Sequence, residues 1–70
     1  MHLHARYTGA ELLTEATATP PFGPSFTAED MADADTLEVW VTSLADVADV
    51  TVWRLLRDRS AVAFAQVSGF

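Results

Sequence analysis

Two histidines near the start of the chain have a spacing that could begin a metal site. His2 and His4 stand two residues apart, so on a strand both rings would lie on one face. A zinc site needs three or four ligands, with further partners that orient them. The sequence has no Cys and offers only distant carboxylates to complete the set. We therefore expect no metal, no cofactor and a solvated histidine pair.

The serines and glycines form none of the patterns of nucleophilic catalysis or phosphate binding. No nucleophile-elbow glycine pattern surrounds any of the four serines, and Ser43 is better placed as a helix cap. The three glycines are too scattered for a phosphate loop, and the chain has no Lys. Paired carboxylates can do acid–base chemistry, but 70 residues rarely form both a core and a deep cleft. We predict that the chain is not an enzyme.

Acidic residues dominate the charge of the chain. Ten Asp or Glu stand against four Arg, which makes the formal net charge −6. From Tyr7 to Trp53 there are nine acidic residues and no basic one. Repulsion among clustered carboxylates costs stability, so we interpret this cluster as kept for a partner. The alternative is that the acidity serves solubility alone.

One aromatic residue and three arginines accompany this acidic stretch. Trp40 shares a predicted strand face with Glu38, where it is either an exposed interface residue or part of the core. Arg54, Arg57 and Arg59 are typical of protective charges at a hairpin tip, so we expect no direct nucleic-acid contact. The predicted partner-binding residues are Glu29, Asp30, Asp33, Asp35, Glu38, Trp40, Asp46 and Asp49.

A capping box gives the clearest local signal for a helix. Thr27 and Asp30 fit the N-cap and N3 positions, and Phe26 and Met31 fit a hydrophobic staple. The pattern predicts a short helix over 28–34. The segment before it holds all three prolines and predicts a rigid surface loop over 19–25.

Strict alternation of apolar and polar residues predicts a strand over 36–42, with Leu37, Val39 and Val41 on one face. Residues 44–59 fit a helix as well, but their β-branched residues favour a helical turn near 44–48 and then a strand over 50–56. A turn at Asp58-Arg59 would lead into a last strand over 61–67.

The hairpin has a predicted register. Pairing Leu56 with Ala61 places Trp53 opposite Phe64 on one face of the sheet. The same register places Leu55 opposite Val62.

The amino end predicts a strand over 2–7, with Leu3, Ala5 and Tyr7 on one face, and a second extended stretch over 11–17. Half of the residues are hydrophobic, which is typical of a globular chain. The expected fold is a single α+β domain over 1–70, in which one short helix packs on a small antiparallel β-sheet that ends in a β-hairpin.

Membrane and export signals are weak. Arg6 is a lone positive charge in residues 1–20, and Glu11 and Glu15 interrupt the place of an apolar region, so we expect no signal peptide. The longest uncharged stretches, 16–28 and 60–70, fall short of the roughly 20 residues of a membrane span. We expect a cytoplasmic protein with no membrane partner.

The capped acidic helix over 26–34, the strand over 36–42 and the hairpin over 50–67 form a small acidic plan without a catalytic motif. In type, though not in any shared motif, this plan resembles the small anti-defence proteins of mobile elements, in particular anti-CRISPR proteins. The resemblance implies a non-enzymatic inhibitor in the host-cell cytoplasm. Such an inhibitor would bind a basic, nucleic-acid-binding protein such as a CRISPR effector subunit and occlude its basic surface as a phosphate mimic.

A second hypothesis belongs to another class of protein. It is a small structural or regulatory subunit, such as an antitoxin or assembly component, that binds through an apolar sheet face and can form a homodimer. The two hypotheses differ in their response to salt. An electrostatic binder loses affinity steeply as ionic strength rises, whereas an apolar interface responds little.

Overall fold

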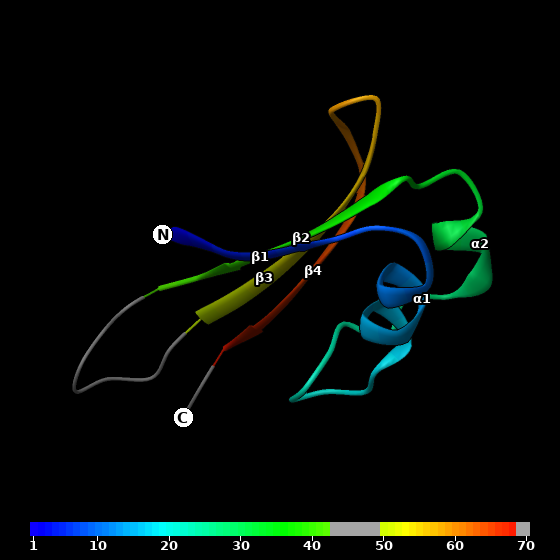
Figure 1. Cartoon of the computed structure of the whole chain (residues 1–70). Coiled ribbons are helices and arrows are strands. Elements are labelled where there is room, and N and C mark those ends of the chain that lie inside the picture. The colour runs from blue at the N-terminus through cyan, green and yellow to red at the C-terminus, as the bar shows by residue number, and fades with distance from the viewer. Residues whose placement is uncertain (43–49, 69–70) are drawn as a thin grey trace.

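A four-stranded antiparallel sheet with helices on one side forms the structure, a computed structural model that describes residues 1–42 and 50–68 (Figure 1). The strands lie in the order β1-β2-β3-β4, which makes β2 and β3 the central pair. The predicted α+β fold ending in a hairpin is confirmed, whereas the predicted helical turn near 44–48 lies outside the described residues. In chain order the elements are β1 (His2–Tyr7), α1 (Gly9–Thr17), α2 (Ala28–Met31), β2 (Thr36–Val41), β3 (Val50–Arg57) and β4 (Ser60–Ser68).

The core lies between one face of the sheet and α1. Leu37 and Leu55 are fully buried at its centre, and Leu12, Ala16 and Phe26 cover them from the helical side. The predicted alternation of β2 is confirmed, since Leu37 and Val39 both belong to this core. No helix covers the opposite face of the sheet in the described part of the chain, and we call it the open face.

The helix that packs on the sheet is α1, in a segment that we expected to be extended. The prediction of a strand over 11–17 was wrong, because helical spacing places Leu12 and Ala16 one turn apart on the same side. Both are buried against the sheet, whereas a strand would turn successive residues to opposite faces. Packing on the sheet stabilises a helix of only nine residues, which would be marginal alone.

The capping box is confirmed, but its helix is one turn long. Thr27 Oγ1 accepts from the Asp30 amide at 3.1 Å, and Asp30 Oδ2 accepts from the Thr27 amide at 3.1 Å. The helix was expected to reach residue 34 but ends at Met31, where Ala32 donates to the carbonyl of Glu29 in a tightened turn. None of the residues of α2 is buried, so packing does not extend it.

The register of the β3–β4 hairpin differs from the prediction by one residue. The Asp58-Arg59 turn is confirmed, with positive φ at both residues as in a type I′ turn. Leu56 pairs with Ala61 as expected, but a bulge follows, and Leu55 pairs with Ala63 rather than Val62. The extra residue on β4 exchanges the faces of the residues beyond it.

The bulge separates the two aromatic residues of the hairpin. Trp53 pairs with Ala65 and is 5 % exposed in the core, whereas Phe64 pairs with Arg54 on the open face and is 74 % exposed. The predicted contact between Trp53 and Phe64 was therefore wrong.

A second bulge changes the face of Leu3 in β1. Ala5 and Tyr7 pair with Val39 and Leu37 and pack against the core as predicted. The register shifts between Leu3 and Ala5, so Leu3 pairs with Trp40 on the open face. The prediction that Leu3 shares the face of Ala5 was wrong for this reason.

The loop between the helices folds back onto α1. Ser25 donates to the carbonyl of Ala18 and Phe26 to that of Ala16, both at 2.8 Å. Gly23 lies against Ala18 so closely that a Cβ atom on it would contact the Ala18 Cβ and lie 2.6 Å from the Ala18 carbonyl oxygen. The loop thereby returns to the end of α1, where Phe26 is buried in the core.

We predict that Gly23→Ala lowers the free energy of unfolding by about 1–3 kcal/mol, because the backbone must shift to admit the added methyl group. The exposed loop substitution Thr19→Ala serves as the control and should change stability little. Urea denaturation followed by circular dichroism measures both. Equal stability of the two variants would contradict the tight contact.

Candidate functional site

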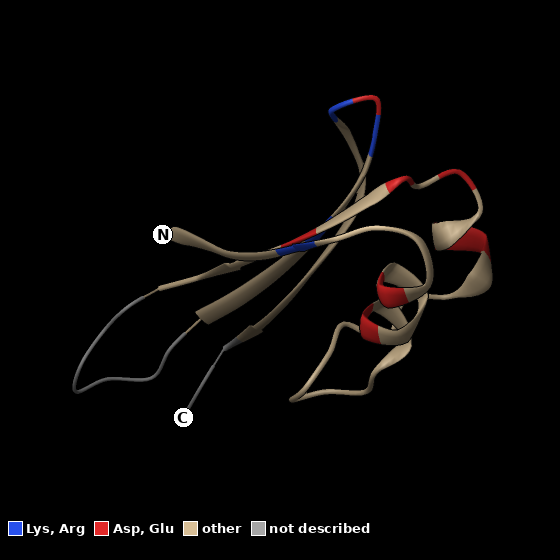
Figure 2. Ribbon diagram, viewed as in Figure 1, with Lys and Arg blue, Asp and Glu red and all other residues tan. Residues whose placement is uncertain are grey.

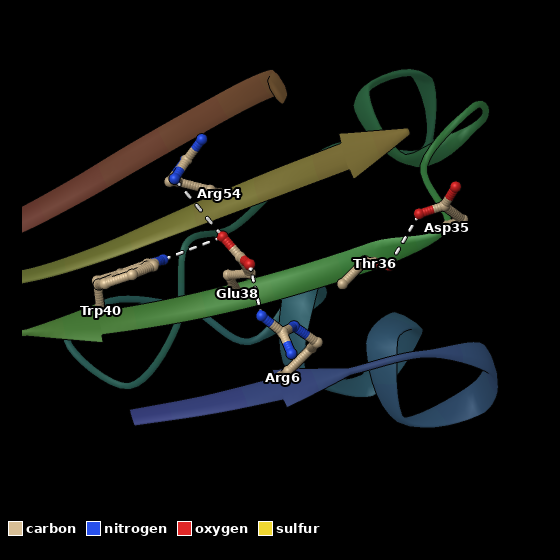
Figure 3. A network of polar contacts seen from close by, with 6 residues as sticks. All are labelled: Arg6, Asp35, Thr36, Glu38, Trp40 and Arg54. Carbon is tan, nitrogen blue, oxygen red and sulfur yellow. Dashed lines mark hydrogen bonds and ion pairs between the residues drawn. The ribbon is translucent and has the colours of Figure 1, made fainter. Parts of the chain in front are cut away.

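A buried carboxylate lies at the centre of the open face. Glu38 in β2 is 8 % exposed, and its neighbours across the sheet are Arg6 in β1 and Arg54 in β3. Glu38 Oε2 accepts from Arg6 Nη2 at 3.1 Å, and Oε1 lies 3.6 Å from Arg54 Nη1 (Figure 3). Oε1 also accepts from Trp40 Nε1 at 3.1 Å. One carboxylate thus joins three strands.

These partners keep Glu38 ionised. Burial raises the pKa of Glu38, but the hydrogen bonds from Trp40 and Arg6 and the positive charges of Arg54 and Arg6 outweigh it. The pKa therefore lies below its ordinary value. At neutral pH Glu38 is therefore ionised, and its charge is already paired within the sheet.

A second carboxylate anchors the hairpin tip. Asp35 Oδ2 accepts from the Asp58 amide at 3.0 Å, and Oδ1 accepts from Thr36 Oγ1 at 2.8 Å. These two hydrogen bonds hold the pKa of Asp35 below its ordinary value. Nearby, Arg57 Nη1 lies 3.1 Å from Asp33 Oδ1 in an exposed ion pair. The segment before β2 is thereby tied to the turn between β3 and β4.

A shallow cleft of about 620 Å³ lies on the open face between these two anchors. Its walls include the indole of Trp40 and the side chain of Leu56. Its charged lining is balanced in sign, with three carboxylates and three guanidinium groups. A balanced lining does not favour a strongly charged ligand of either sign. The charged residues are Arg6, Asp35, Glu38, Arg54, Asp58 and Arg59.

Unlike the lining of the cleft, in which the charges balance, the two helices carry acidic residues and no basic residue. The carboxylates of α1, of α2 and of the segment before β2 lie at the same end of the molecule (Figure 2). The backbone bond from Phe26 to Ala16 brings the start of α2 back to α1. We call this surface the acidic side; its residues are Glu11, Glu15, Glu29, Asp30, Asp33 and Asp35.

The acidic side accounts for the whole net charge. Its six carboxylates equal the formal charge of −6, because the other four acidic residues are matched by the four arginines. Five of its six residues are exposed, and Glu15 is half-buried. The rest of the sequence, which includes Asp46 and Asp49 outside the described residues, is formally neutral.

The structure divides the predicted partner-binding residues into separate groups. Four of them lie together on the acidic side, whereas Glu38 and Trp40 lie on the open face and bind each other. Asp46 and Asp49 fall outside the described residues. Glu11 and Glu15 were missed, although they belong to the same base-free stretch, because their segment was predicted to be a strand. The four grouped residues are Glu29, Asp30, Asp33 and Asp35.

The open face also carries apolar side chains that the sequence did not single out. Phe64 and Val62 in β4 are 74 % and 49 % exposed, and Leu3 in β1 is also exposed. The two bulges place them there, since unbroken alternation would turn Leu3 and Phe64 toward the core. Trp40 and Val52 are half-buried between these edges.

His2 and His4 are exposed on β1, and the described residues hold no group of three or more His, Asp or Glu side chains placed for a metal ion. Neither helix in residues 1–42 and 50–68 has the length and apolarity to cross a bilayer.

We predict that Glu38→Gln lowers the free energy of unfolding at neutral pH by about 1–2 kcal/mol, since charged hydrogen bonds are lost while both arginines regain water. The pKa of Glu38 is lowered by folding, so its stabilisation is complete above the ordinary glutamate value of about 4.3 and disappears as pH falls through the lowered folded value. The difference between wild type and variant should shrink on acidification. Urea denaturation across this pH range measures it.

The matched control is Glu29→Gln, which removes an exposed carboxylate from α2. Its effect should be small at every pH. A difference for Glu38→Gln that stays constant down to the lowest pH would contradict the role of the charged form.

Comparisons of the chain with known protein families, with curated proteins and with solved structures give no match, so the candidate site is defined by its own geometry and charge.

Proposed function

We propose that the chain is a non-enzymatic binding protein that docks its acidic side onto the basic surface of a nucleic-acid-binding protein and occludes it. The observation that carries this proposal is the separation of charge. The acidic side gathers six carboxylates, whose summed charge equals the formal net charge of the chain, −6. A partner of opposite charge would approach this end of the molecule first.

The carboxylates of the acidic side are largely free to meet a partner. Glu11 and Glu29 are exposed and have no ion-pair partner among the described residues. Asp33 pairs with Arg57, but both side chains are more than half exposed, so the pair is weak and easily exchanged. Asp30 and Asp35 also serve the fold through their backbone bonds.

Clustered, exposed carboxylates on a rigid support can replace the phosphates that a basic groove normally binds. Phosphate contacts supply most of the sequence-independent affinity of nucleic-acid-binding proteins. A protein that offers negative charges to the same Lys and Arg side chains would compete for them. Its association with the basic protein would be fast and strongly salt-dependent, as it is for other protein pairs with complementary charge.

The class of partner that we propose is a CRISPR effector complex in the cytoplasm of the host cell. Such complexes hold nucleic acid in positively charged channels through the backbone rather than the sequence, so a charge mimic can block them. The resemblance in type to anti-CRISPR proteins supports the same choice. In this proposal the chain contacts the effector protein and not the nucleic acid.

We predict that the triple variant Glu11→Gln, Glu29→Gln, Asp33→Asn weakens the inhibition of an effector at least about tenfold, mainly through slower association and with a flatter salt dependence. Asp30 and Asp35 stay unchanged because their loss would disturb the capping box and the hairpin anchor. Mobility shift of target DNA with purified effector complexes measures inhibition. Binding kinetics at low and high salt measure association.

Single variants provide a matched comparison of position. Glu29→Gln removes one charge from the acidic side, and Asp58→Asn removes one from the hairpin tip, where Asn tolerates the positive φ. The first should slow association and the second should leave it unchanged. Equal effects, or no inhibition of any effector by the wild type, would reject the proposal in this form.

A second candidate function is supported by the exposed aromatic residue on the open face. Phe64 and Val62 offer apolar contacts that suit a structural or regulatory subunit, such as an antitoxin or assembly component. Binding of that kind would respond little to salt and would survive neutralisation of the acidic side.

A further inference from the structure

The strand β4 forms an edge of the sheet that lacks the usual protection. With nine residues, Ser60–Ser68, it is the longest strand described. Its sequence has no charged residue and no Pro. In the described ranges, β4 has a neighbouring strand on the β3 side only (Figure 1). Half of its backbone N–H and C=O groups therefore point away from the sheet.

The other edge of the sheet differs in these respects. The strand β1 carries Arg6, and a bulge at His4 interrupts its regular pairing. Charges, Pro and irregularities are the devices by which proteins prevent edge strands from pairing with another chain. The bulge of the β3–β4 hairpin lies near the start of β4, and from Ala63 onward its register is regular. The unprotected edge is thus β4 and not β1.

The sequence of β4 fits antiparallel pairing with its own copy. The strand Ser60–Ser68 is centred on Phe64, and an alanine stands on either side of that centre. Ala63 would face Ala65 of the second copy, and Val62 would face its Gln66. At the centre, Phe64 would face Phe64 of the second copy on the open face, where paired Cβ atoms lie about 5 Å apart. Side chains that are 74 % and 49 % exposed in one copy, Phe64 and Val62, would then gain apolar contacts.

The distribution of charge permits this association. The helix α1 packs against β1 and β2, at the other side of the sheet from β4. The carboxylates of α1 therefore lie away from the β4 edge, whereas Asp33 and Asp35 lie beside the β3–β4 turn, at the end of β4 and not at its centre. Two copies joined at β4 bring together uncharged strands.

We propose that the chain forms a symmetric homodimer in which the β4 strands of two copies pair antiparallel about a two-fold axis at Phe64. The four-stranded sheet of each copy continues into the other. This inference is independent of the proposed function, because it uses a different surface and requires no basic partner.

The test measures molar mass by light scattering and sedimentation over roughly a hundredfold range of concentration. The wild type should pass from monomer to dimer as concentration rises. Phe64→Glu and Phe64→Lys should each raise the dissociation constant at least about tenfold, because like charges then meet at the axis. A one-to-one mixture of the two variants should restore a dimer, since opposite charges meet there instead.

The matched control is Leu13→Glu, which places the same charge at an exposed apolar position of α1 and should leave the dimer intact. Circular dichroism verifies that each variant is folded, and the wild type tests the proposal without any substitution. A monomer at all concentrations would overturn it. So would a dimer that Leu13→Glu disrupts as strongly as Phe64→Glu, or a mixture of the charged variants that stays monomeric.

Discussion

The ion pairs of Glu38 hold three strands together on the face of the sheet that no described helix covers. Arg6 and Arg54 reach the same carboxylate from the strands on either side of β2, and Trp40 completes its hydrogen bonds. A carboxylate this deeply buried would be costly without these partners. The arrangement depends on register, because a shift of one residue in either neighbour would remove an arginine from the face.

The small size of the chain explains why charged groups lie at the centre of the open face. A helix of nine residues covers one face of the sheet, and the core beneath it consists of few large side chains. The other face must be stable in contact with water. Polar groups at its centre meet this need, and half-buried Trp40 and Val52 lie next to them. Apolar side chains remain exposed toward the edges, where Leu3 and Phe64 lie.

The molecule has two kinds of surface that differ in charge, the acidic side and the uncharged edge of β4. In the described sheet and its hairpin turn, four arginines stand against two carboxylates, Glu38 and Asp58, and two carboxylates of the acidic side also contact the hairpin. The acidic side carries six carboxylates, four of them on the helices, and suits a basic partner. The β4 edge is uncharged and suits another strand. The two surfaces differ in charge and approach each other near the β3–β4 turn, where Asp33 and Asp35 lie.

Features that depend on neighbours in the chain could be predicted from the sequence alone. The capping box of Thr27 and Asp30, the alternation of β2 and the turn at Asp58-Arg59 need only a few adjacent residues, and each is present. The net charge and its base-free stretch are likewise properties of the sequence. Tertiary structure decided the helical state of 9–17, the two bulges and the role of Glu38. These depend on contacts between distant segments: Leu12 and Ala16 need a sheet to cover, a bulge needs a twisted partner strand, and Glu38 meets its arginines only when β1 and β3 flank β2.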